Sequence, residues 1–74
     1  MRSLQLRFGT TIRRLRTEAG YSQEGFADEI DVHRSYMGLI ERGKVAVTLV
    51  TMERLAKGLD MSISALLAQA EREH

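Results

Sequence analysis

Apolar residues recur every three or four positions along most of the chain, which is the spacing of one face of an α-helix. The first such stretch has this spacing at Leu4, Phe8, Ile12, Leu15 and Ala19. Ser3 can cap the start of a helix here, and Gly20 stands where a left-handed residue often ends one. The pattern therefore predicts a helix from Leu4 to Ala19 that buries one stripe of side chains.

The next two apolar stretches are short and close together. The first holds Phe26, Ala27 and Ile30, and the second holds Tyr36, Met37 and Ile40. Four positions beyond Ile30 the chain has the charged Arg34, so the two stripes belong to separate helices. We expect one helix over 23–30, capped by Ser22, and another over 33–41. Two short helices joined by about three residues form a helix-turn-helix.

The turn between these two helices falls at Asp31. A tight turn of this kind favours a residue with positive φ, which Gly adopts most easily and Asp or Asn more easily than other side chains. Val32 is apolar and can fill the angle between the helices, and the small Ala27 suits their closest approach. We therefore expect a positive φ at Asp31.

Two further helices are expected in the last third of the chain. Thr48 caps the first, which ends near Gly58 and has an apolar face of Leu49, Met52, Leu55, Ala56 and Leu59. Ser62 caps the second, whose apolar residues are Ile63, Leu66, Leu67 and Ala70. The lack of Pro and the small number of aromatic residues also favour helices. The fold class is therefore predicted to be all-α, with five helices.

Length and composition narrow the class of protein. A chain of 74 residues makes one domain, 1–74, and a core of this size supplies only about 3–5 kcal/mol, so an oligomer is expected. The chain has no Cys, which excludes disulfides and Cys-based zinc sites and favours a cytoplasmic protein. No apolar run approaches the roughly 18 residues of a membrane span, and the N-terminus lacks a signal peptide, so no membrane partner is expected.

The charges are unevenly distributed although the net charge is only +1. Residues 1–23 carry five Arg and one acid, 24–31 carry four acids and no base, and 33–44 carry three bases and one acid. Such a distribution suits a protein that presents one face to a polyanion, and it also suits many solvated helical proteins.

Catalytic and metal-binding chemistry is not predicted. The acids Asp28, Glu29 and Asp31 lack supporting His, Cys or a Gly-rich loop, and a solvated helix face explains them better. His33 and His74 do not have the spacing of metal ligands. We expect no enzyme, no metal, no cofactor and no small-molecule ligand.

Residues Phe8 to Leu67 resemble the phage-repressor and Cro-like (XRE-type) helix-turn-helix family. The resemblance lies in the ordered segments "YSQEGFA", "HRSYMGLIERG" and "LVTMERLAKGL", and within the family it is greatest to the controller proteins of restriction–modification systems. It implies a compact lambda-repressor-like domain with its helix-turn-helix at about 23–41 and its dimerisation elements at about 45–72. It also implies a transcriptional regulator that binds a two-fold-related double-stranded DNA operator as a homodimer.

The helix expected over 33–41 is the one that would contact bases. The side opposite Met37 and Ile40 carries Arg34, Ser35, Gly38, Leu39 and Arg42. Arg34 can form a bidentate pair with guanine, Ser35 can donate to or accept from a base edge, and Leu39 offers an apolar contact. Without the resemblance, an ordinary solvated face would explain the same residues.

Further roles follow for Arg42 and for residues outside this face. Contacts to DNA phosphates are expected from Gln23, Tyr36, Arg42 and Lys44, although Tyr36 suits a purely structural role equally well. The resemblance implies a partly buried structural ion pair between Arg16 and Glu41. It also places the dimer interface at Val47, Val50, Met61, Ile63 and Leu67, residues that can alternatively complete the core of one subunit.

The chain departs from the family pattern in two places. Asp31 stands where relatives have Gly, and Val45, Ala46 and Val47 replace a basic residue, Asn and a small residue after "ERGK". The second change removes charged contacts to phosphate. It keeps open the alternative of a protein-interaction module on the same fold, beside that of a phage-type repressor or an antitoxin.

Overall fold

A computed structural model describes residues 2–74. Its helices are α1 (Leu4–Glu18), α2 (Gln23–Glu29), α3 (Arg34–Glu41), α4 (Leu49–Gly58) and α5 (Ile63–Arg72). The predicted all-α fold of five helices is confirmed for these residues. Three predicted ends are wrong by one residue, because Ala19 and Ile30 are C-caps and His33 is an N-cap.

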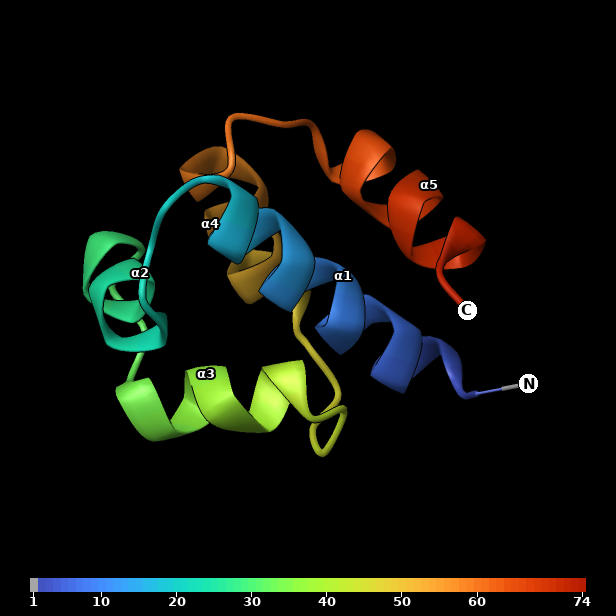
Figure 1. Cartoon of the computed structure of the whole chain (residues 1–74), viewed down its shortest axis with the longest axis horizontal. Coiled ribbons are helices and arrows are strands. Elements are labelled where there is room, and N and C mark those ends of the chain that lie inside the picture. The colour runs from blue at the N-terminus through green and yellow to red at the C-terminus, as the bar shows by residue number, and fades with distance from the viewer. Residues whose placement is uncertain (1) are drawn as a thin grey trace.

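The first helix is the centre of the arrangement. It contacts α5, α3 and α2, while α4 packs against α5. In Figure 1, α1 crosses the middle of the molecule, α3 runs along one edge and α2 lies beside the start of α3. Arg2 and His74, the first and last residues that the structure describes, are in contact, because the Arg2 guanidinium donates to the backbone carbonyl of His74. The helix-turn-helix thus occupies one side of the molecule, away from the chain ends.

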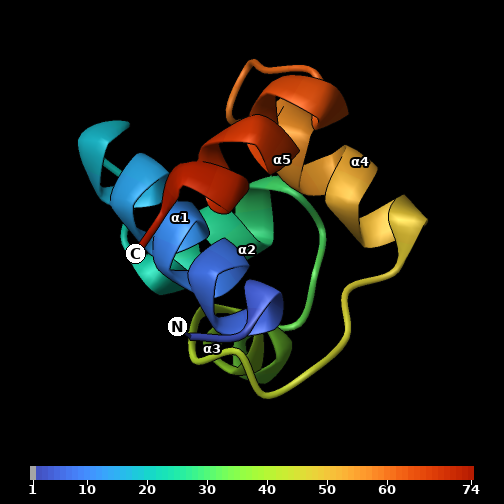
Figure 2. The ribbon, with the colours of Figure 1, turned by 90° about the vertical axis from the view of Figure 1, so that its right-hand side faces the viewer.

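The core draws on all five helices. Its largest fully buried side chains include Ile12, Phe26, Met37, Ile40, Leu55 and Leu66. The predicted apolar stripes are wrong at their ends, because Leu4, Ala19 and Leu49 are exposed. These residues lie at the first turn or the C-cap of their helices, where no neighbouring helix covers them. Figure 2 shows the start of α4, where Leu49 lies, on the outer side of the molecule.

Each helix begins with a side chain that accepts a hydrogen bond from a backbone N–H in its first turn. The caps are Ser3, Ser22, His33, Thr48 and Ser62. Four of them were expected from the sequence, whereas His33 was expected inside its helix. Its ring nitrogen Nδ1 accepts from the backbone N–H of Ser35 at 3.2 Å. The start of α3 is therefore defined by a histidine rather than by a hydroxyl.

The turn at Asp31 is the left-handed end of α2. Asp31 has φ 59°, its N–H donates to the Asp28 carbonyl at 3.3 Å, and the Val32 N–H donates to the Ala27 carbonyl at 3.0 Å. These two bonds form the Schellman motif, in which a left-handed residue turns the chain out of the helix axis. The expected positive φ is confirmed, and the motif explains why the turn is so short.

A second aspartate has the same role at the end of α4. Asp60 has φ 57°, with the Met61 N–H donating to the Ala56 carbonyl at 2.9 Å. The sequence had suggested Gly58 as the end of this helix. Gly58 is the last residue of α4, as predicted, and an added Cβ there would lie 2.4 Å from Ile30 Cγ2. Its lack of a side chain lets α4 approach the end of α2.

Polar contacts join the C-cap of α5 to α1. Thr11 Oγ1 donates to Glu73 Oε1 at 2.9 Å, and Arg14 Nη2 lies 3.3 Å from the same oxygen. The Thr11 hydrogen bond, followed by hydrogen bonding and charge from Arg14, holds the pKa of Glu73 below its ordinary value of 4.5. The carboxylate form of Glu73 therefore supports the packing of the end of α5 on α1.

Replacing Asp31 by Gly tests what holds this turn. Among residues 2–74 no hydrogen bond involves the Asp31 carboxylate, and the side chain is exposed. We expect Asp31→Gly to leave the free energy of unfolding unchanged or to raise it, because relief of the left-handed strain offsets the greater freedom of Gly in the unfolded chain. Urea unfolding measures this, with Asp60→Gly as the matched variant. A loss above roughly 1 kcal/mol at Asp31 would show that its side chain supports the turn.

Candidate nucleic-acid interface

The third helix has one buried side and one exposed side. Met37 and Ile40 are fully buried, whereas Arg34, Ser35 and Arg42 are exposed. Figure 1 shows that α3 lies along an edge of the molecule, with no other helix on its outer side. An exposed helix of this length can enter the major groove of B-form DNA.

The middle of α3 differs from the sequence prediction. Gly38 was expected on the exposed side, but it is buried. An added Cβ would lie 3.1 Å from Arg42 Nη1 and 3.5 Å from Gln23 Oε1, so these two side chains cover it. Leu39 is half-buried, so only part of its side chain is available for an apolar base contact.

Arg16 and Glu41 form an ion pair beneath α3. Arg16 Nε lies 2.6 Å from Glu41 Oε2, and Arg16 Nη2 donates to Glu41 Oε1 at 3.0 Å. The third nitrogen, Nη1, donates to the Tyr21 carbonyl at 2.8 Å, so every nitrogen of the guanidinium is used. Only 11% of the Arg16 side chain and 3% of the Glu41 side chain are exposed. This geometry is bidentate, which is the favourable arrangement for a buried pair.

Gln23 belongs to the same network. Its Nε2 donates to Glu41 Oε1 at 3.1 Å, and the side chain is half-buried. The sequence did not suggest this contact, because it joins residues 18 positions apart. In residues 2–74 every buried side-chain nitrogen and oxygen has a hydrogen-bond partner. The contact of Gln23 with a DNA phosphate stays a prediction.

Arg34 lies at the start of α3 between two carboxylates of α2. Its Nη2 donates to Asp28 Oδ2 at 3.1 Å, and its Nη1 lies 3.3 Å from Glu24 Oε2. The hydrogen bond to Asp28, together with the charges of Asp28 and Glu24, raises the pKa of Arg34 above its ordinary value. The predicted base-contacting cation is therefore exposed and paired at the same time.

Ser35 lies next to the cap of α3. Its Oγ is 2.7 Å from His33 Nδ1, the atom that also accepts the backbone N–H of Ser35. An accepting Nδ1 carries no proton, so the Ser35 hydroxyl is the donor in this pair. Its oxygen then remains free to accept a hydrogen bond, for example from the amino group of adenine or cytosine.

The loop after α3 is anchored by its valines. Val45 and Val47 are half-buried and pack against the core, while Lys44, Ala46 and Thr48 are exposed. The two valines therefore hold the loop on the protein, and Val45 does so at a position where relatives have a basic residue. Lys44 remains as the exposed cation of this loop. Tyr36 is half-buried, with its side chain packed against the core.

The residues predicted for a dimer interface do not share one environment. Val50 is 60% exposed, whereas Val47, Met61, Ile63 and Leu67 are partly buried and pack against the core. Leu49 is 74% exposed and was assigned to the buried face instead. Val47 and Leu67 line a mainly apolar groove of about 270 Å³, together with Leu4, Gln5, Phe8, Ala46 and Met52.

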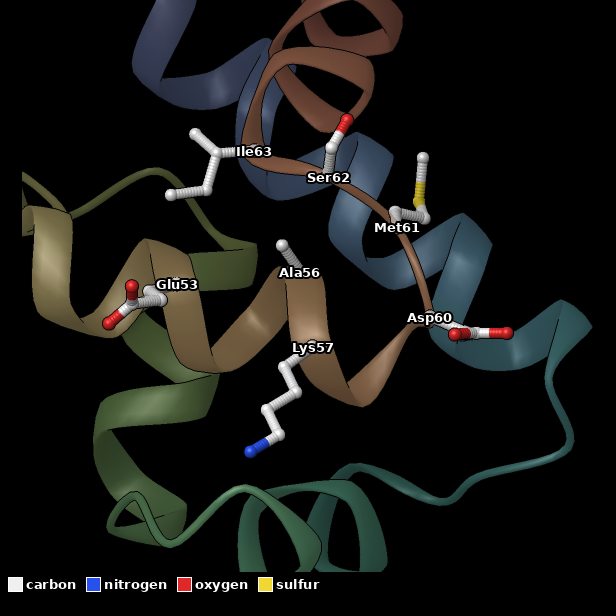
Figure 3. A pocket seen from close by; sticks show the side chains of 7 residues that line it. All are labelled: Glu53, Ala56, Lys57, Asp60, Met61, Ser62 and Ile63. Carbon is white, nitrogen blue, oxygen red and sulfur yellow. The ribbon is translucent and has the colours of Figure 1, made fainter.

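The hollow between α4 and α5 has no arrangement suited to catalysis. It measures about 440 Å³, and its charged residues Glu53, Lys57 and Asp60 point in three different directions (Figure 3). Among the residues that the structure describes, no three His, Asp or Glu side chains gather in a way that could hold a metal ion. Within the same residues no helix is long and apolar enough to cross a membrane.

Replacing Glu41 tests how much the buried pair contributes to the free energy of unfolding. We expect Glu41→Ala to lower the free energy of unfolding by about 3–5 kcal/mol, because it leaves the Arg16 charge buried without its partner. Adding Arg16→Ala should then cost little more. Urea unfolding of the two single variants and the double variant measures the coupling. Additive losses would mean that the two side chains do not stabilise each other.

Comparison with known proteins agrees with this geometry. A protein family described as a helix-turn-helix domain matches residues 7–72. The control protein C.MunI from a Mycoplasma species is 40% identical over 74 residues, which cover 99% of this chain and 100% of that protein.

Solved structures are similar over most of the chain. The restriction-modification controller protein C.AhdI from Aeromonas hydrophila has a TM-score of 0.80 and 42% identity, covering 84% of this chain and 94% of that chain. The controller protein C.Esp1396I, crystallised as a tetramer with its natural 35 base-pair operator, has a TM-score of 0.84 and 26% identity over 97% of this chain and 95% of its own. This chain therefore belongs to the helix-turn-helix family, among the controller proteins of restriction–modification systems.

Proposed function

We propose that this protein regulates transcription by binding a DNA operator in the promoter region of a restriction–modification system. The observation that carries the proposal is the exposed side of α3, with Arg34 and Ser35 at its start and a buried ion pair behind it. The relative that was crystallised on its operator supports the same role for this chain. Regulators of this family act by occupying DNA, so no catalytic step is proposed, and the site of action is the cytoplasm.

The third helix lies in the major groove in this proposal. Arg34 pairs with guanine O6 and N7, Ser35 accepts from a base amino group, and the exposed part of Leu39 contacts a thymine methyl group. Tyr36, Arg42 and Lys44 contact phosphates on either side of the groove. Gln23 adds a further phosphate contact through the amide hydrogen that Glu41 leaves free.

The proposed active form is a homodimer. One α3 covers only a few base pairs, and the two-fold axis of a dimer would place two copies on half-sites about 10–10.5 base pairs apart. Val50 and Leu49 are exposed in the first turn of α4, and Met52 of the same helix lines the apolar groove, so together they offer a surface that a second copy can cover. We assign the interface to Val47, Val50, Met61, Ile63 and Leu67, with Leu49 added by its exposure.

Substitutions at Arg34 and Lys44 distinguish base recognition from phosphate binding. We expect Arg34→Ala to weaken binding to an operator selected from a random DNA pool far more than binding to a scrambled duplex, since a bidentate Arg–guanine pair discriminates by about 1–3 kcal/mol. Lys44→Ala should weaken both duplexes equally and reduce the salt slope by about one. Fluorescence anisotropy over a range of salt concentrations measures both effects.

Two results would contradict the proposal in different ways. Equal losses on both duplexes for Arg34→Ala would make Arg34 a phosphate contact only. No binding of either duplex by the unmodified protein at low salt would favour the protein-interaction module instead.

A substitution at Val50 tests the proposed dimer without disturbing the core, because Val50 is exposed. We expect the unmodified protein to sediment as a dimer at micromolar concentration and Val50→Asp to sediment as a monomer with weaker operator binding, because a carboxylate cannot be buried there without a partner. Thr17→Asp is the matched control, since Thr17 is exposed at the opposite end of α1 from the groove. Dimers that persist in Val50→Asp would place the interface elsewhere.

A further inference from the structure

Two acids of α2 are arranged around the base-contacting arginine. Glu24 and Asp28 are four residues apart, so they lie on one face of α2, and this face meets the start of α3. Each carboxylate contacts a different terminal nitrogen of Arg34, at 3.3 Å for Glu24 and 3.1 Å for Asp28. The guanidinium is thus fixed from two directions by a second helix.

The arrangement leaves part of the guanidinium free. Arginine has five N–H donors, and the two carboxylates contact only its two terminal nitrogens. In the described part of the chain no hydrogen bond uses Arg34 Nε, so this N–H and the remaining hydrogens of the terminal nitrogens can still face a ligand. A bidentate pair with a guanine edge needs two such donors side by side.

We propose that Glu24 and Asp28 are specificity-determining residues that position Arg34 for a guanine edge and keep it from binding phosphates at random. This proposal rests on the DNA-binding function proposed above. An arginine held in one orientation loses less conformational freedom when it meets the correct base. The two carboxylates also compete with DNA phosphates for the guanidinium, because a phosphate would form the same kind of charged hydrogen bond.

The exposure of the pairs favours this role over a structural one. The side chains of Arg34, Glu24 and Asp28 are 57%, 70% and 61% exposed, and ion pairs so open to water contribute little to stability. The two helices are already joined through buried Phe26, Ala27 and Met37. Substitutions that remove only the two charges should therefore leave the fold intact.

Simple competition and positioning predict different results. If the carboxylates only competed with DNA, removing them would raise affinity for every duplex, and the ratio of operator to scrambled affinity would stay constant or rise. If they position Arg34, their removal lowers this ratio, because the correct geometry is no longer held in advance while phosphates become accessible. The ratio is therefore the quantity to measure.

The experiment compares Glu24→Gln/Asp28→Asn with the unmodified protein. We expect the ratio of operator to scrambled affinity to fall by about threefold to tenfold, the effect expected for two exposed charge contacts. The salt slope on scrambled DNA should steepen by about 0.9, because the released Arg34 adds one phosphate contact. Fluorescence anisotropy at several salt concentrations, with an operator selected from a random pool, measures both quantities.

Two further variants separate positioning from a change in net charge. Glu29→Gln removes one acid of the same helix that has no contact with Arg34 among the described residues, so it should shift both affinities equally and leave the ratio unchanged. In an Arg34→Ala background the two substitutions at Glu24 and Asp28 should no longer change the ratio. Circular dichroism checks that each variant is folded.

Each outcome decides the proposal. A ratio that stays constant or rises in Glu24→Gln/Asp28→Asn overturns it, as does the same fall in the Arg34→Ala background. Failure of the unmodified protein to bind any duplex would instead overturn the DNA-binding function and this proposal with it.

Discussion

The position of α3 depends on one buried ion pair. The Arg16 guanidinium on α1 binds both carboxylate oxygens of Glu41 at the end of α3, and its remaining nitrogen binds the carbonyl of Tyr21 in the connection to α2. Gln23 joins the same carboxylate from the first residue of α2. Two buried charges are costly unless they are paired and hydrogen-bonded, and among residues 2–74 every buried side-chain nitrogen and oxygen has a hydrogen-bond partner. One carboxylate thus fixes the end of α3 relative to α1 and α2.

A close approach between the backbones of α1 and α3 also fixes the position of α3. A Cβ added at Gly9 of α1 would lie 2.2 Å from the carbonyl of Ile40 and 2.7 Å from that of Glu41. The absence of a side chain at this position therefore lets α1 contact the last turn of α3 directly. The ion pair and the close contact lie at the same end of α3. The opposite end, which carries Arg34 and Ser35, is placed by the turn after Asp31 and by the His33 cap.

Patterns of local spacing predicted the helices well because caps and apolar stripes are local features. Asp31 could be assigned a positive φ because the turn was short and its neighbours were helical. The end of α4 at Gly58 was predicted, but the positive φ of Asp60 two residues later was missed, and the close approach of Ile30 and Phe26 explains the glycine. The exposure of Leu49 and the burial of Gly38 depend on which distant side chains cover them. The contacts of Gln23 and Arg34 likewise join separate helices, so spacing along the chain could not reveal them.

Arginine–carboxylate pairs occur in two settings in this fold, and the two settings differ in how far the side chains are buried. The Arg16–Glu41 pair is 11% and 3% exposed, so its attraction is little screened and its rupture would leave a charge stranded in the protein. The side chains of Arg34, Glu24 and Asp28 are more than half exposed, so water and salt screen their attraction and the pairs contribute little to stability. A helix held in place by a buried pair therefore presents an arginine that is oriented by two exposed pairs. In the proposed complex with DNA, the buried pair defines the position of α3 and the exposed pairs orient Arg34 toward a base edge, so the two kinds of pair act on the same contact from different depths in the protein.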